Sequence, residues 1–161
     1  MKHWVMDYET LSNCFTAVFE HYKTQETKVF VIHDLQNDTD IFIDFLKQNI
    51  QNKEWHISYN GLAFDAQVTH YILDNYESWT GLSGCDIATA IFKYAQICIQ
   101  KANNKEFSDY AQWKMKIGQI DLFKMHHWDN PAKRSSLKWI QYSMDWQNIL
   151  DMPIHHDTKI E

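Results

Sequence analysis

The chain has 161 residues, of which 45% are hydrophobic and 15% aromatic. This is enough apolar material for one compact domain with its own core, and too little length for two domains of ordinary size. The 15 basic and 21 acidic residues give a net charge of −6, the wrong sign for a protein that holds duplex nucleic acid mainly through backbone phosphates. Any contact with nucleic acid should therefore be short or mediated by metal ions.

The sequence also argues against a secreted protein and against a membrane-spanning one. No apolar stretch approaches the roughly 18 residues of a membrane span, and the N-terminus lacks the pattern of a signal peptide. The three cysteines, Cys14, Cys85 and Cys98, are an odd number without metal-ligand spacing, which is typical of reduced and mostly buried thiols. We expect a cytoplasmic protein without membrane contact, in the host cytoplasm if it is viral.

The first third of the chain predicts three strands, over residues 4–7, 15–22 and 28–33. Alternate residues of the second strand are apolar or aromatic and would share one face of a sheet. They are Phe15, Ala17, Phe19 and His21. Three consecutive strands with short connections predict an antiparallel meander.

Two helices and a fourth strand should follow. Residues 37–39 offer N-cap side chains before an apolar stripe with helical spacing, made of Ile41, Phe42, Phe45, Leu46 and Ile50. Residues 55–59 predict the fourth strand, and Gly61 marks the turn after it. A second helical stripe then carries Asp65 near its first turn, and it consists of Phe64, Val68, Tyr71 and Ile72.

A patch of glycine and serine at residues 81–84 precedes a long predicted helix over residues 86–102. Its inward side chains should be Ile87, Ile91, Tyr94, Ala95 and Cys98. Residues 101–109 are polar and predict a loop.

Alternating apolar residues between 115 and 125 predict one more strand, and Ser135 and Ser136 can cap a helix over residues 137–144. The expected fold is therefore of the α/β class. We expect a mixed sheet flanked by helices, with an antiparallel meander followed by parallel strands.

Three carboxylates are expected at strand ends. Asp7 and Glu9 lie two positions apart where the first strand runs out, so their side chains project to the same face and can share a cation. Asp65 would bring a third carboxylate from a neighbouring element. Open α/β sheets place their sites at this end of the strands, and carboxylate oxygens suit Mg²⁺ or Mn²⁺. The pattern predicts a metal-dependent nuclease.

The motifs around these acids resemble those of a known enzyme family. Residues 7–10, Asp-Tyr-Glu-Thr, match the Asp-x-Glu-Thr of the first exonuclease motif, and residues 60–65 match the second, Asn-x-x-x-Phe-Asp. Residues 120–124 and 135–139 are similar to the strand and the Ser-Leu-Lys helix that precede the third motif. The chain resembles the ribonuclease-H-like DEDD exonucleases, and most of all the 3′–5′ proofreading domain of phage family B-type DNA polymerases.

The resemblance implies a ribonuclease-H-like sheet and a site of four carboxylates that hold two divalent ions, Mg²⁺ or Mn²⁺. Asp7, Glu9 and Asp65 would be metal ligands and catalytic residues. The terminal nucleotide would be held by Thr10, Leu11, Asn60 and Phe64. The implied activity is removal of nucleotides from the 3′ end of single-stranded DNA during replication proofreading.

The chain departs from the family at the third motif. A Tyr-x-x-x-Asp or His-x-x-x-x-Asp should follow the Ser-Leu-Lys helix, and neither is found there. We therefore expect residues 1–161 to be one exonuclease domain that lacks this motif, as the N-terminal part of a longer protein. The expected partner besides DNA is a polymerase domain, in the same chain or in another.

Three alternatives remain open at the level of sequence. The chain could be a non-catalytic module that binds single-stranded nucleic acid in a degenerate site, which the missing fourth acid favours. It could be an exoribonuclease of the same fold that trims RNA, because the two motifs do not discriminate 2′-hydroxyls. It could also be a structural subunit whose acids are ordinary surface residues.

Overall fold

The computed structural model describes residues 3–126, 135–147, 149, 155 and 158–160. The strands are β1 (His3–Thr10), β2 (Phe15–His21), β3 (Thr27–His33), β4 (Gln36–Asn37), β5 (Trp55–Ser58) and β6 (Gly118–Asp121). The helices are α1 (Thr39–Gln51), α2 (Asp65–Asn75), α3 (Gly84–Asn104), α4 (Leu122–His126) and α5 (Leu137–Ser143), with short 3-10 helices η1 (Tyr76–Trp79) and η2 (Gln112–Lys114).

The strands form one mixed sheet of six strands in the order β4-β3-β2-β1-β5-β6. The meander β1 to β4 is antiparallel, whereas β5 runs parallel to β1, and β6 runs parallel to β5. The sequence prediction of an α/β fold with an antiparallel meander followed by parallel strands is confirmed. This strand arrangement is consistent with a ribonuclease-H-like sheet.

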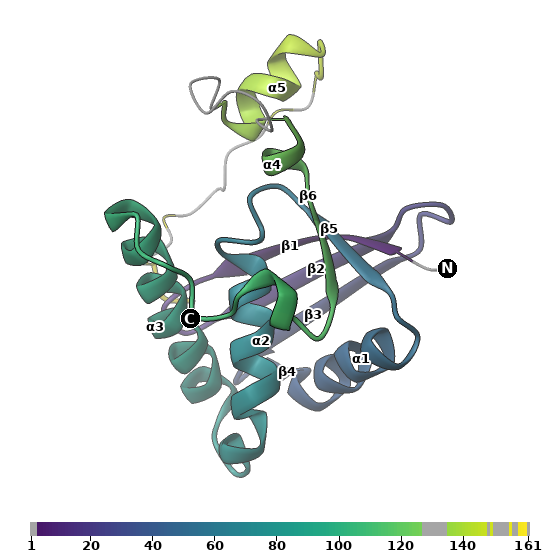
Figure 1. Ribbon diagram of the computed structural model, residues 1–161. Coiled ribbons are helices and arrows are strands. Elements are labelled where there is room, and N and C mark those ends of the chain that lie inside the picture. The colour runs from purple at the N-terminus through teal and green to yellow at the C-terminus, as the bar shows by residue number, and fades with distance from the viewer. Residues whose placement is uncertain (1–2, 127–134, 148, 150–154, 156–157, 161) are drawn as a thin grey trace.

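Helices α1, α2 and α3 lie on one side of the sheet, and α4 and α5 lie beyond the end of β6 (Figure 1). The alternation along β1 follows from this layering, because Trp4, Met6, Tyr8 and Thr10 are buried. The intervening side chains of the meander face the open side, where Val18 is 41% exposed and Val29 is 56% exposed. Asp7 and Glu9 belong to this exposed set.

The core between the sheet and the helices is rich in aromatic rings. Phe19 is fully buried and packs edge-on against Phe45, with ring centroids 4.9 Å apart. Tyr8 contacts Phe15 in the same edge-on manner at 5.1 Å. Such pairs add to the free energy gained by burying the rings, so the predicted inward face of β2 is where the sheet meets α1.

Helix α1 is rotated relative to the predicted stripe. Ile41 is 64% exposed, while Ile43, which the stripe omitted, is 3% exposed. The expected cap also differs, because Asp38 does not cap the helix and its carboxylate accepts a hydrogen bond from the backbone N–H of Val31 (2.9 Å). Asp38 thus attaches the start of α1 to β3.

Helix α3 confirms its predicted inward residues, and it is longer than expected at both ends. It continues to Asn104, so residues 101–104 are helical, and Lys105 ends it in the left-handed conformation (φ 58°). Ser83 caps its N-terminus by accepting a hydrogen bond from Asp86 N–H (3.1 Å).

The strand predicted over residues 115–125 is much shorter, because β6 ends at Asp121 and the chain turns into α4. The reason is local, since the Asp121 carboxylate accepts hydrogen bonds from the N–H groups of Phe123 (2.9 Å) and Lys124 (3.3 Å), as an N-cap residue does. The predicted helix after Ser136 is confirmed as α5, with Ser136 Oγ accepting from Trp139 N–H (3.2 Å).

Cys14, Cys85 and Cys98 are free thiols, as expected. Among the described helices, none is both long and apolar enough to span a membrane.

Candidate functional site

The candidate site lies where the three parallel strands end. β1 continues to Thr10 but pairs with β5 only at His3, Trp4 and Val5. Beyond Val5, the β5 side of β1 therefore faces the turn that follows β5 and the first residues of α2. A gap of this kind between parallel strands is where open α/β sheets bind ligands.

Two of the predicted acids meet at this position. Asp7 lies at the surface of β1, whereas Asp65 is the first residue of α2 and is only 5% exposed. The charge of Asp7 raises the pKa of Asp65. The two carboxyl groups, which come from different elements, therefore lie close enough to interact.

Several carboxyl groups lie close together in this site, and this closeness shifts their pKa values. Burial, together with the charges of Asp7 and Asp121, raises the pKa of Asp65 to about 8. Burial also raises the pKa of Asp7, although part of its side chain is exposed. Glu9 has a raised pKa for two reasons, its partial burial and the charge of Asp7. The three predicted acids therefore interact with one another, Asp7 being the common neighbour.

No basic side chain compensates these charges in the described part of the chain, where the salt bridges are Lys28–Glu26, Lys101–Asp109 and Lys116–Asp74. Uncompensated carboxylates with raised pKa values are common at functional sites. The donor set consists of oxygen atoms, which fits Mg²⁺ or Mn²⁺. As their side chains are placed, no three described His, Cys, Asp or Glu residues form a group that could hold a metal ion. Binding would therefore require the carboxylates to rotate toward a common ion.

The turn after β5 is built for close packing. A Cβ atom added to Gly61 would lie 1.9 Å from Ser58 Oγ and 3.2 Å from Asp65 Oδ2. Only glycine therefore fits between these two side chains. Ser58 Oγ is buried without a hydrogen-bond partner in the described structure, so an unsatisfied hydroxyl lies next to the buried Asp65 carboxyl.

Asp121 holds this turn from the neighbouring strand. Its carboxylate accepts hydrogen bonds from the N–H groups of Asn60 (2.9 Å) and Leu62 (3.1 Å), in addition to the two from α4. Asn60 adopts a left-handed backbone conformation (φ 63°), which Asn tolerates better than most residues. Asp121 is therefore a fourth acid near the site, occupied by four backbone donors.

The first turn of α2 is fixed to β1 by a chain of hydrogen bonds. The Tyr8 and Thr69 hydroxyls lie 2.8 Å apart, and Thr69 Oγ1 donates to the Asp65 carbonyl (2.9 Å). The buried Gln67 side chain in turn donates to the carbonyls of Leu62 and Tyr110. These contacts attach the first turn of α2, and with it Asp65, to β1 and to the segments around Leu62 and Tyr110.

A small cavity of about 190 Å³ adjoins the acids. It is lined by Tyr8, Glu9, Thr10, Phe64, Gln96 and Ile99. Three residues predicted from the two motifs, Glu9, Thr10 and Phe64, are thus brought together. The other predicted substrate residues are not part of this cavity, since Leu11 is buried in the core and Asn60 lines a separate cavity of about 300 Å³.

The structure adds residues to the site that the sequence analysis did not select. Gln96 and Ile99 come from α3, which no motif connects to β1, and Ser58 precedes the second motif by two residues. Asp121 could have been selected from the sequence, because it follows a short stretch of alternating apolar residues, as Asp7 does. Its contacts, however, depend on the parallel pairing of β6 with β5, which the sequence does not specify.

No protein-family profile matches this chain, and comparisons with curated protein sequences and with solved structures gave no significant match.

Proposed function

We propose that this chain is a metal-dependent 3′–5′ exonuclease domain that removes nucleotides from the 3′ end of single-stranded DNA, as in proofreading. The observation that carries the proposal is the mutual interaction of Asp7, Glu9 and Asp65 at the carboxyl ends of parallel strands, without a basic partner in the described structure. The resemblance of residues 7–10 and 60–65 to two exonuclease motifs supports the same reaction.

Each residue has a role in this proposal. Asp7, Glu9 and Asp65 would hold two Mg²⁺ or Mn²⁺ ions, which supply activation of water and stabilisation of the leaving 3′ oxygen. Thr10 and Phe64 would position the terminal nucleotide, because they line the cavity that also contains Glu9. Asn60 would contact the DNA strand from the other side of the turn after β5. A polymerase domain, in the same chain or in another, would deliver the primer end.

The test is hydrolysis of a 5′-labelled single-stranded DNA oligonucleotide in the presence of Mn²⁺, followed by gel electrophoresis. We expect products that shorten from the 3′ end, and a rate at least about 100-fold lower for Asp7→Asn and Asp65→Asn. Glu20→Gln is the matched control, because Glu20 lies on the same open face in β2 and is not part of the site. Wild-type rates in both site variants would contradict the proposal, and a matched RNA oligonucleotide measures sugar preference.

A non-catalytic binding module is the second candidate, and one observation favours it. Asp121, the acid closest to completing a set of four, is occupied by four backbone N–H groups. A chain that binds the oligonucleotide in EDTA as well as in Mn²⁺, and does not shorten it in Mn²⁺, would be such a module.

A further inference from the structure

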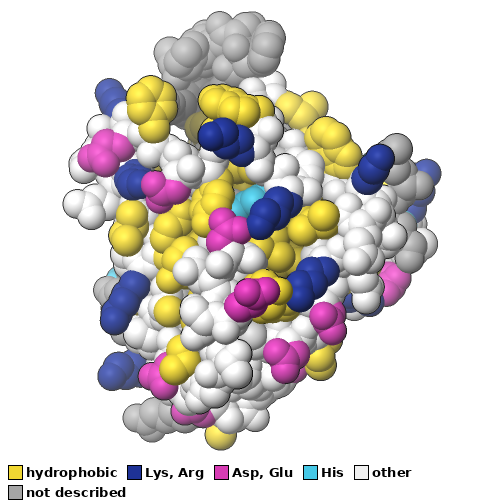
Figure 2. Space-filling model, turned by 60° about the horizontal axis from the view of Figure 1, so that its bottom comes forward, with side chains coloured by type: hydrophobic (Ala, Val, Ile, Leu, Met, Phe, Trp, Pro, Cys, Tyr) yellow, Lys and Arg dark blue, Asp and Glu magenta, His cyan; other side chains and the backbone are white. Residues whose placement is uncertain are grey.

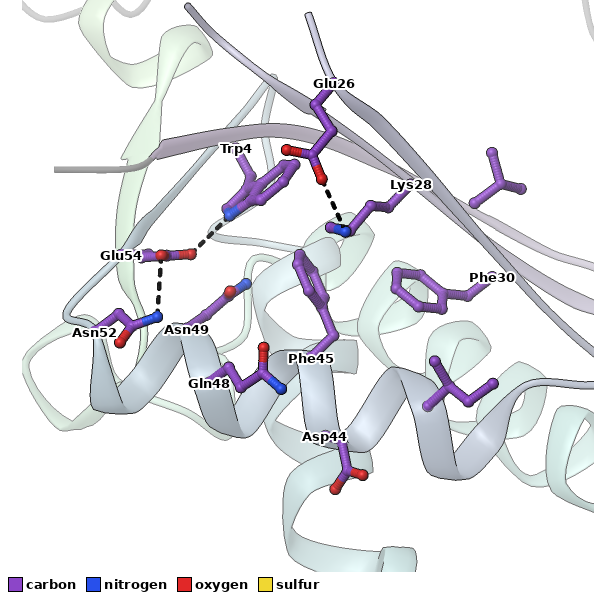
Figure 3. A pocket seen from close by; sticks show the side chains of 12 residues that line it. Trp4, Glu26, Lys28, Phe30, Asp44, Phe45, Gln48, Asn49, Asn52 and Glu54 are labelled. Carbon is purple, nitrogen blue, oxygen red and sulfur yellow. Dashed lines mark hydrogen bonds and ion pairs between the residues drawn. The ribbon is translucent and has the colours of Figure 1, made fainter. Parts of the chain in front are cut away.

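A groove of about 550 Å³, which none of the three predicted acids lines, lies between α1 and the edge of the sheet at β3 (Figure 3). Residues of one side of α1 form its first wall, among them Ile41 and Gln48. Lys28 and Val29 of β3 form the second wall, and Trp4 and Phe45 form the floor. A helix that flanks an open strand edge is an arrangement used by proteins that bind extended peptides.

The outer edge of β3 is open along this groove. β4 pairs only with Ile32 and His33. Val31 points its backbone groups outward, because its N–H donates to Asp38 Oδ2 (2.9 Å) and its carbonyl accepts from Asp38 N–H (2.8 Å). Residues two apart in a strand point the same way, so Val29 presents its N–H and carbonyl to the groove. An added strand would find a donor and an acceptor there.

Glu54 closes one end of the groove with a buried carboxylate, only 5% exposed. It accepts from Trp4 Nε1 (2.7 Å) and Asn52 Nδ2 (3.3 Å), and from the Asn49 amide (2.8 Å) in the orientation that also satisfies His56. These donors are neutral, and no salt bridge of the described residues includes Glu54. A carboxylate accepts about four hydrogen bonds, so it retains capacity for a cationic donor.

The aromatic floor already accommodates one ammonium group. Lys28 Nζ lies 5.8 Å from the Trp4 ring centroid and 6.0 Å from that of Phe45, and it pairs with Glu26 at 2.9 Å. Figure 3 shows Lys28 extending over the two rings, with Glu54 reaching Trp4 from the other side. Cation–π contacts of this kind favour basic groups. The lining has three acids, Glu26, Asp44 and Glu54, for one lysine, so a further positive charge is favoured.

We propose that this groove binds an extended peptide segment that carries a basic side chain. The peptide backbone pairs with Val29 as an additional strand beside β3. A Lys or Arg of the peptide enters on the helix side and donates to Glu54 across the ring of Trp4. The exposed side chain of Ile41 contacts an apolar residue of the peptide on the helix side, and that of Val29 contacts one on the open side of the sheet. This peptide site is separate from the carboxylate site and does not depend on nuclease activity.

The test is selection of random seven-residue peptides displayed on phage against the wild-type chain, with removal of those that also bind Val29→Pro. Proline removes the outward N–H and is tolerated on edge strands. We expect the retained peptides to share a Lys or Arg between β-forming residues. Failure to enrich any peptide that distinguishes the two chains, or enrichment of peptides without a basic residue, would overturn the proposal.

Affinities of a synthetic selected peptide, measured by fluorescence anisotropy, separate the backbone contribution from the charge contribution. Glu54→Gln, or norleucine in place of the basic residue, should weaken binding at least tenfold. Glu20→Gln removes the same charge from the opposite face and should change it less than twofold. Equal effects of the two variants would refute a specific role for Glu54. Val29→Thr keeps the N–H and should bind normally.

Amide exchange measured by NMR provides the readout if Val29→Pro does not fold. The bound peptide should slow exchange of the Val29 N–H at least tenfold and shift the Trp4 indole N–H resonance. Unchanged exchange at Val29 in the saturated complex would overturn the added strand.

Discussion

At the scale of single residues, Asp65 is the acid of the candidate site whose pKa is shifted most clearly by its surroundings. It begins a helix, it is buried, and its carboxyl lies near those of Asp7 and Asp121, so that its pKa rises to about 8. A carboxyl with this pKa is largely protonated at neutral pH in the absence of a cation. A divalent cation, by contrast, favours the ionised form. Proton and metal binding at Asp65 should therefore compete.

This raised pKa predicts how stability depends on pH. The unfolded chain releases the Asp65 proton near pH 4 and the folded chain near pH 8, so the folded state binds more protons between these values. The free energy of unfolding should then fall as pH rises through this window. Each unit of pKa shift corresponds to about 1.4 kcal/mol. We expect Asp65→Asn to be clearly more stable than the wild type at pH 8.5 and nearly equal at pH 4.5, in urea unfolding without metal.

The control for this prediction is Asp74→Asn. Asp74 is partly exposed and pairs with Lys116, and this hydrogen bond lowers its pKa despite the opposing effect of burial. Removing its charge should change stability slightly and with the opposite sign. An equal change in the free energy of unfolding between pH 5 and pH 8 in Asp65→Asn and in the wild type would contradict the assignment.

At the scale of elements, the site depends on how three strand ends are joined. β6 contributes Asp121, whose carboxylate fixes both the turn after β5 and the start of α4. α3 contributes Gln96 and Ile99 to the cavity beside Glu9. The two motifs supply the acids, and elements outside the motifs supply the walls and the fixed turn.

We therefore predict that Asp121→Asn destabilises the chain although it changes few atoms. Asn has one acceptor oxygen where Asp has two, so some of the four backbone N–H groups lose their hydrogen-bond partner. Hydrogen bonds to a charged group contribute about 1.5–3 kcal/mol each, and we expect a loss of about 2 kcal/mol in urea unfolding. Amide exchange should accelerate first at Asn60 and Leu62. A loss no greater than that of Asp74→Asn would show that the turn does not need the carboxylate.

At the scale of the whole molecule, charge decides how a nucleic acid can be held. The chain carries a net charge of −6. On the side shown in Figure 2, the coloured basic and acidic side chains alternate around a strip of hydrophobic ones, without a continuous basic surface. A polyanion is repelled by such a molecule unless cations at the carboxylates bridge the two.

Binding of a single-stranded oligonucleotide should accordingly depend strongly on divalent ions and weakly on monovalent salt. With Ca²⁺ as an ion that supports binding, we expect at least tenfold tighter binding than in EDTA. The slope of log affinity against log salt should correspond to about two phosphate contacts or fewer, each contributing about 0.7 for single strands. Tight binding in EDTA with a steep salt dependence would contradict cation bridging and favour the binding module.

Much of the fold was predictable because its signals are local. The alternation of Phe15, Ala17, Phe19 and His21 and the helical stripe of α3 both correspond to buried faces. Errors arose where the hydrogen bonds of one side chain decide the local structure. Asp38 binds β3 instead of capping α1, and Asp121 ends β6 early by capping α4. Propensity and periodicity do not specify which of several backbone donors a carboxylate will bind.

The sequence by itself determined that Asp7 and Glu9 share a face and that the fold is of the α/β class, because these follow from periodicities of two and 3.6 residues. Only the tertiary structure decided that Asp65 is buried against β1, that Asp121 is occupied by backbone donors, and that α3 forms one wall of the cavity. Those features depend on the parallel register of β1, β5 and β6. Register between strands far apart in the chain is fixed by packing of the whole core rather than by neighbouring residues.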